Sequence, residues 1–259
     1  MTSNAALAKR VSIASLWQAT PSGDEPGPAR FRPELLTPLP AVARRYLACA
    51  IAPSTPLATA VRLWMHGHIK LADKWHPFQA EEVIRWERGF VWRANTWMQG
   101  LPIFGADRLV DGVGEMRWKL LGLLPVMTGA GDDVTRSAVG RMQGEVVWLP
   151  GVLCRPGVTW TALDDARVTA HFMALGQPAS LTLTVGKDGR LEQAQLKRWG
   201  NPAGEAYHQV DFGVLVEASD TFGGYTIPTR MRAGWFFGSD RFAREGEFFR
   251  CTIDRAVYR

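Results

Sequence analysis

Residues 61–71 read VRLWMHGHIKL, and apolar and polar side chains alternate along most of this stretch. Val61, Leu63 and Met65 share one parity, whereas Arg62 and Lys70 lie on the other. Because successive side chains of a β-strand point to opposite faces, the alternation predicts a long strand with one buried face. The two histidines of the stretch fall on the polar face, where a pair without a third ligand does not predict a metal site.

The same alternation recurs along the rest of the chain and predicts about ten to twelve strands. The further stretches are residues 80–86, 90–98, 116–120, 158–162, 168–172, 181–185, 191–199, 206–216, 227–237 and 242–253. A Gly-Lys-Asp-Gly turn at residues 186–189 joins two of them as a hairpin. Strands that follow one another, each with a single apolar face, are typical of an antiparallel meander.

Two segments carry a helical period instead. Residues 39–50 have apolar side chains at helical spacing, and residues 132–149 begin with two aspartates that can cap a helix and end before Pro150. Two helices are too few to cover a flat sheet of this size. The predicted fold is therefore α+β: a strongly curved antiparallel sheet, or half-barrel, with both helices across its concave face.

The chain is expected to form a single curved-sheet domain over residues 38–259. Residues 18–40 contain six prolines and no sustained period, which is typical of a linker. Residues 1–37 are therefore expected to be a flexible N-terminal segment. An apolar run at residues 11–17 follows two basic residues, but two serines interrupt it, so we do not expect a cleaved signal peptide.

Composition narrows the class of protein. The 259 residues include 30 basic and 25 acidic ones, and the basic residues are scattered, so nucleic acid is not an expected partner. No stretch reaches the ~18 apolar residues of an integral membrane helix. The three cysteines are far apart and favour a reducing compartment, which predicts a cytoplasmic protein. No nucleotide, cofactor or metal motif occurs, so neither a cofactor nor a metal is expected.

Candidate functional residues lie on the second predicted helix. Arg141 and Glu145 are four residues apart and thus neighbours on the helix surface, and Trp148 follows three residues later. They form either an exposed ion pair or, where the helix covers a cavity, a desolvated pair that faces a ligand. His208 lies on an apolar strand parity, which suits a core histidine or an acid, base or ligand anchor.

Tryptophan is unusually frequent, with eleven Trp against four Tyr. Its large ring suits either a broad core or the wall of a pocket for an apolar ligand. Besides Trp148, the tryptophans expected in such a pocket are Trp92, Trp118, Trp160 and Trp235.

The helix motif also carries a family resemblance. Residues 141–150, RMQGEVVWLP, resemble the Arg-x-x-x-Glu-x-x-Trp-x-Pro signature of an uncharacterised bacterial family of unknown function, and the likeness extends over roughly residues 38–255. The order of elements is similar to that of lipoprotein carriers of the LolA and LppX type, whose concave face holds acyl chains. This resemblance implies a half-barrel fold with an apolar cavity, while the family itself implies no activity.

Three functions compete at this point. The first is noncatalytic binding of an apolar or amphipathic, lipid-like small molecule by the eight residues named above, with Arg141 and Glu145 near its polar end. The second is an enzyme that uses Glu145 as acid or base beside Arg141 and His208. The third is a protein-interaction domain, which predicts a large exposed apolar patch.

Overall fold

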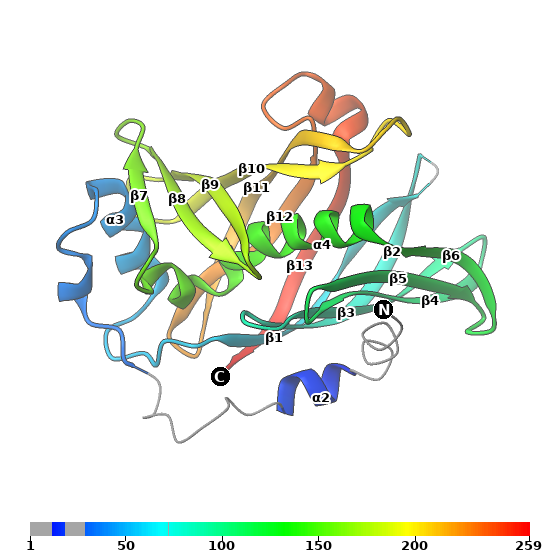
Figure 1. Cartoon of the computed structure of the whole chain (residues 1–259), viewed down its shortest axis with the longest axis horizontal. Coiled ribbons are helices and arrows are strands. Elements are labelled where there is room, and N and C mark those ends of the chain that lie inside the picture. The colour runs from blue at the N-terminus through cyan, green and yellow to red at the C-terminus, as the bar shows by residue number, and fades with distance from the viewer. Residues whose placement is uncertain (1–11, 19–28, 72) are drawn as a thin grey trace.

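The computed structural model describes residues 12–18, 29–71 and 73–259, and these form one antiparallel sheet of thirteen strands (Figure 1). The order across the sheet is β6-β5-β4-β3-β2-β1-β13-β12-β11-β10-β9-β8-β7. The strands are β1 (Ala60–Leu71), β2 (Lys74–Arg85), β3 (Gly89–Met98), β4 (Leu101–Val110), β5 (Val113–Leu120), β6 (Leu124–Ala130), β7 (Thr159–Ala162), β8 (Arg167–Ala174), β9 (Gln177–Val185), β10 (Leu191–Gly200), β11 (His208–Phe222), β12 (Tyr225–Trp235) and β13 (Glu247–Tyr258).

Two meanders, β1–β6 and β7–β13, make up this sheet and meet where β1 pairs with β13. The predicted antiparallel sheet is present, but it has more strands than the alternation of apolar and polar side chains predicts, because β4 and β6 lack this alternation. The inward parity of β4 carries Gly105 and Asp107 where apolar side chains were expected. Strand β6 is exposed at nearly every position, so it shows no alternation of burial.

The sheet bends around the second helix, α4 (Asp132–Glu145), which contacts both β5 and β10 (Figure 1). These two strands are eight places apart in the strand order. In a flat sheet they would be separated by about 38 Å, at roughly 4.8 Å per strand, whereas α4, with 14 residues at about 1.5 Å each, is only about 21 Å long. One helix can touch both strands only because the two meanders fold toward each other.

Helix α4 begins after Gly131, and its start differs from the predicted cap. Asp132 and Asp133 occupy the first turn, where their charges favour the positive end of the helix dipole, but no side chain caps the helix. Asp133 instead accepts a hydrogen bond from the indole N–H of Trp199 at 2.8 Å. The helix continues into the short 3-10 turns η2 (Val146–Trp148) and η3 (Pro150–Cys154).

The first predicted helix is α3 (Ala41–Ala50), which follows Pro40. It buries Tyr46 and Leu47 and contacts β7, β8, β9 and β12, so it covers one end of the space that α4 crosses. Among the described residues, no helix has the length and apolarity needed to span a membrane.

A third helix, α2 (Ile13–Gln18), lies on the outer face of the sheet, on the side of β2 and β3 away from α4 (Figure 1). Leu16 is fully buried there against Val83 and Val91, which point away from the inner face. Arg85 donates a hydrogen bond from Nε to the carbonyl oxygen of Leu16 at 3.0 Å. This contact satisfies one of the carbonyl groups that the end of a helix leaves open.

The segment expected to be flexible, residues 1–37, thus contains ordered elements where the structure describes it. Besides α2, the 3-10 helix η1 (Pro33–Leu36) is present, and Phe31 is only 1% exposed. Part of the predicted apolar run forms the helix α2 because the outer face of the sheet offers apolar partners to Leu16, which the local sequence pattern does not indicate. Residues 1–11 and 19–28 lie outside the described residues.

Candidate functional site

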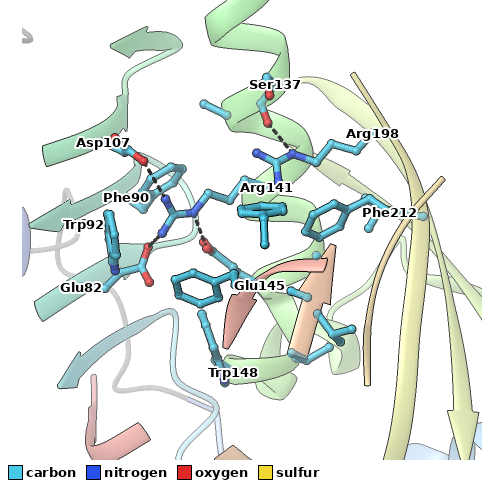
Figure 2. A pocket seen from close by; sticks show the side chains of 18 of the residues that line it. Glu82, Phe90, Trp92, Asp107, Ser137, Arg141, Glu145, Trp148, Arg198 and Phe212 are labelled. Carbon is cyan, nitrogen blue, oxygen red and sulfur yellow. Dashed lines mark hydrogen bonds and ion pairs between the residues drawn. The ribbon is translucent and has the colours of Figure 1, made fainter. Parts of the chain in front are cut away.

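A cavity of about 230 Å³ lies between α4 and the inner face of the bent sheet (Figure 2). One face of α4 lines it, through residues spaced three or four apart: Val134, Ser137, Ala138, Arg141, Gly144 and Glu145. Most of the remaining wall is apolar and aromatic, and includes Met65, Trp92, Trp148, Phe212, Met231 and Phe249. The predicted helix therefore does cover a cavity, which favours the desolvated alternative for Arg141 and Glu145.

The cavity exists because small side chains meet on both of its sides. On the sheet, Ala194, Val214 and Ala233 form a row across β10, β11 and β12, since Val214 pairs directly with both alanines. On α4, Ser137, Ala138 and Gly144 face the cavity with little volume. Protein interiors are otherwise close-packed, so a gap of this size between two elements reflects the choice of small residues.

A second row, on β2, β3 and β4, carries the charges. Trp92 pairs directly with Glu82 on one side and with Asp107 on the other, so all three point to the same face. The two carboxylates thus stand on either side of an indole ring. Arg141 of α4 lies over this row, with its guanidinium carbon 5.2 Å from the centre of the Trp92 ring.

Arg141 joins three carboxylates (Figure 2). It donates from Nη2 to Glu82 Oε1 at 2.7 Å and from Nε to Glu145 Oε1 at 2.5 Å. A longer contact of 3.4 Å links Nη1 to Asp107 Oδ2. The Glu82 side chain is 0% exposed, and that of Arg141 is 18% exposed. The guanidinium is therefore the cation that holds three inward-facing acids together.

Trp118 of β5 holds one of the three carboxylates, that of Asp107, in place. Its indole N–H donates to Asp107 Oδ1 at 3.0 Å, which orients the carboxylate toward Arg141. The ring packs directly over Gly105, where an added Cβ would lie 2.0 Å from a ring carbon. A glycine at this position of β4 is thus needed for Trp118 to lie flat and reach Asp107.

Burial changes the protonation of these groups. It raises the pKa of Glu82 to about 8, with a further rise from Glu145, and Arg141 offsets only part of the effect. Burial also raises the pKa of Glu145 and of Asp107, in both cases against the lowering effect of Arg141. Arg141 itself keeps a pKa above its usual value, because the three carboxylates outweigh the effect of its burial. Near neutral pH we therefore expect Glu82 to carry a proton.

Arg198 of β10 is a second, half-buried cation of the cavity wall. Its Nε donates to the backbone oxygen of Ser137 at 3.2 Å, which ties β10 to α4. Its guanidinium carbon lies 4.8 Å and 5.0 Å from the ring centres of Phe212 and Trp235. Burial lowers the pKa of Arg198 to about 10, and the nearby Arg141 adds to this effect.

Two acceptor atoms of the cluster remain open. Glu82 Oε2 and Glu145 Oε2 are buried and have no hydrogen-bond partner among the described residues. Buried polar atoms are normally paired, so these two oxygens are where a donor group of a ligand, a water molecule or the proton of Glu82 would lie. No three His, Cys, Asp or Glu side chains of the described residues are arranged to hold a metal ion, and Arg141 occupies the centre of this acid cluster.

The structure brings together half of the predicted ligand-binding residues. Arg141, Glu145, Trp92 and Trp148 line the cavity, and the indole N–H of Trp148 donates to the backbone oxygen of Pro228. Two further predicted tryptophans do not line the cavity, but each contacts a residue that does. These are Trp118, which holds Asp107, and Trp235, which stacks on Arg198.

The other two predicted residues lie elsewhere. Trp160 of β7 packs at the edge of the core and does not line the cavity. His208 stands at the beginning of β11 with 46% of its side chain exposed, and its Nδ1 lies 3.0 Å from the backbone oxygen of Ala206. The structure therefore does not place His208 beside Arg141 and Glu145, as the acid–base alternative required. The strand parity misleads here because the inner face of β11 is covered only further along the strand.

Three charged residues of the cavity wall are not predicted from the sequence: Glu82, Asp107 and Arg198. Glu82 and Arg198 occupy the inward parity of their strands beside apolar neighbours such as Ile84 and Leu196. Asp107 instead follows Gly105 on the inward parity of β4, which the pattern does not predict as a strand. A charged residue that interrupts an apolar parity is the signal that could have revealed Glu82 and Arg198, because an ionised group rarely faces a core without a partner.

The chain belongs to a family of unknown function, DUF6920, whose model matches residues 37–258. This confirms the family resemblance that the motif of residues 141–150 indicated. No curated protein shows significant sequence similarity to the chain.

Solved structures that are similar to this chain share 8–11% of its sequence. A LolA superfamily protein from Nitrosomonas europaea has 10% identity and a TM-score of 0.41, over 85% of this chain and 92% of that one. An outer-membrane lipoprotein-sorting protein domain from Vibrio parahaemolyticus has 8% identity and a TM-score of 0.39, over 77% and 85%. A DUF1329 family protein from Desulfovibrio piger has 11% identity and a TM-score of 0.35, over 78% and 86%.

Proposed function

We propose that the protein binds an apolar or amphipathic, lipid-like small molecule in the cavity beneath α4, without changing it chemically. The observation that supports this function is the composition of the cavity wall, which is mostly apolar and aromatic, with charged groups gathered around Arg141. Small-molecule sites typically combine such apolar walls with a few converging polar groups. In this proposal the apolar part of the ligand lies against the row of Ala194, Val214 and Ala233.

The polar part of the ligand would meet the charged cluster. Glu82, which carries a proton near neutral pH, and Glu145 each have one oxygen without a partner among the described residues, and Arg141 already has three carboxylates. A group that both donates and accepts hydrogen bonds, such as a hydroxyl or an amide, would satisfy these two oxygens. We therefore favour a ligand whose polar group is neutral over one that carries a carboxylate.

Filling the cavity should abolish binding. We expect Ala194→Phe to weaken the binding of N-phenylnaphthylamine, an apolar fluorescent dye, by roughly tenfold or more, because the new ring occupies the space that the dye would take. Dye titration by fluorescence measures this effect. Native mass spectrometry of the purified protein should show a lipid-like molecule on the wild type and none on the variant.

The matched control is Gln195→Phe, which adds the same ring at the next residue of β10, on the exposed side. It should bind the dye as the wild type does. Equal dye affinity in the wild type and in Ala194→Phe, with both folded by circular dichroism, would show that the cavity is not the binding site.

A second candidate function is an acid–base enzyme, and the protonated Glu82 favours it. A general acid works best when its pKa lies near the working pH, and Glu82, with a pKa of about 8, stands beside Glu145 and an open acceptor atom. The two candidates differ in what happens to the bound molecule. If the molecule extracted from wild-type protein is altered and that from Glu82→Gln is not, the protein is an enzyme.

We also propose a cytoplasmic location. Cys49, Cys154 and Cys251 are free thiols, and burial raises the pKa of each, that of Cys154 to about 12. Free, unreactive thiols are typical of proteins in reducing compartments. Fractionation of the producing cell, with immunodetection of the protein, tests this location directly.

A further inference from the structure

Exposed apolar side chains gather at one end of the sheet. Eight of the eleven large apolar residues that are exposed in the described part of the chain lie on two neighbouring hairpins, β3–β4 and β5–β6. They are Trp97, Leu101, Phe104, Leu121, Leu123, Leu124, Val126 and Met127, with Leu123 the most exposed at 77%. We call residues 97–104 and 120–127 the apolar tips. Proteins rarely expose an apolar patch of this size to water unless the patch binds a partner or a membrane.

The apolar tips present these side chains on both faces of the sheet. Leu101 pairs with Met98 on the inner face, whereas Phe104 pairs with Asn95 on the outer face. Leu121 and Leu123 lie in the turn between β5 and β6 and so extend the apolar surface around the end. A protein that docked on the sheet would cover one face only. An end that is apolar all round suits insertion into an apolar medium.

Basic side chains flank the tips. The β1–β2 hairpin ends on the same side of the molecule (Figure 1) and contributes Lys70 and Lys74 against the single acid Asp73. On β5, the exposed Lys119 pairs directly with Phe104 on the outer face, and Arg117 is 50% exposed. This end of the sheet therefore combines apolar tips with an excess of positive charge, which complements the surface of an anionic bilayer.

We propose that the apolar tips insert into the surface of an anionic phospholipid bilayer. Leu121, Leu123 and Leu124 enter the acyl region, Trp97 lies at the interface, and Lys119 meets the lipid phosphates. The protein thus binds a membrane by one end of its sheet. This surface is separate from the cavity, so the proposal holds or fails independently of the proposed ligand.

Co-sedimentation of the full chain with vesicles tests the interaction. Vesicles of phosphatidylcholine mixed with phosphatidylglycerol should bind the protein, and high salt or pure phosphatidylcholine should weaken binding. The double variant Leu123→Asp, Leu124→Asp should lower the partition coefficient by roughly tenfold or more, because charges replace two apolar side chains that would enter the acyl region. Lys119→Glu should weaken binding to the mixed vesicles only.

The matched control is Met173→Asp, at an exposed apolar residue of β8, far from the tips in the strand order. It should bind vesicles as the wild type does, and circular dichroism should show that all variants are folded. The proposal is overturned if mixed vesicles do not bind the wild type, or if both aspartate variants bind equally well. One further result would overturn the proposal: light scattering shows that the wild type is a dimer and the double variant a monomer, while vesicles bind neither protein. The tips would then join two copies of the chain.

Discussion

Replacing Arg141 by methionine should destabilise the protein by about 3–5 kcal/mol, the usual cost of removing one partner of a buried ion pair. Methionine fills much of the same space, so the loss arises from charge rather than from packing. Glu82, Asp107 and Glu145 would remain around the cavity without the cation that pairs with all three of them. Urea unfolding followed by circular dichroism measures the change in the free energy of unfolding.

Two further variants make this result interpretable. Arg136→Met lies on the exposed side of the same helix, where the guanidinium stacks on Trp199, and should cost about 1 kcal/mol or less. Adding Glu82→Gln to Arg141→Met should restore part of the lost stability, because it removes one of the unpaired acids. A single variant Arg141→Met that unfolds like the wild type would mean that the carboxylates do not depend on this cation.

Glu82→Gln alone should make the protein more stable than the wild type at pH 8 but not at pH 5. The pKa of Glu82 rises from an ordinary 4.5 to about 8 in the folded protein. An acid with a raised pKa holds its proton more tightly when folded, so its stabilising contribution is complete below about pH 4.5 and is lost as the pH rises through 8. Over pH 5 to 8 this loss amounts to roughly 3–4 kcal/mol.

Glutamine resembles the protonated acid and does not titrate, so it avoids this loss. The measurement is urea unfolding of both proteins at several pH values, and the difference between them should widen steadily from pH 5 to pH 8. Glu192→Gln, at an exposed position of β10, serves as the control and should run parallel to the wild type. A difference between Glu82→Gln and the wild type that does not vary with pH would show that Glu82 is ionised throughout this range.

The two substituted residues, Arg141 and Glu82, differ in how well the sequence alone predicts their place in the charged cluster. Arg141 and Glu145 are neighbours on one helix turn, and a local period is enough to place them together. Glu82 and Asp107 are 25 positions apart in the sequence and reach Arg141 only because each pairs directly with Trp92. Strand register depends on pairing between distant segments, which the alternation of a single strand does not contain.

The same distinction explains the errors. His208 follows an apolar parity, but its position at the start of β11 leaves its side chain exposed. Strand β4 carries a glycine and an aspartate on its inward face, and β6 exposes apolar side chains along most of its length. The local pattern of neither strand therefore resembles that of a half-buried strand. Helix α2 is ordered because the outer face of β2 and β3 offers apolar partners, and that face forms only once the sheet has formed.

The order of amino acids is enough to predict the local elements: successive half-buried strands in antiparallel order, a long helix between two meanders, and the Arg141–Glu145 pair on that helix. Their periods of two and of about 3.6 residues report which side of each element is apolar. Three features are seen only in the folded chain: β1 pairs with β13, the sheet bends around α4, and small residues leave a cavity beside three carboxylates. These features depend on contacts between distant segments, because a period describes one element while a cavity is bounded by many.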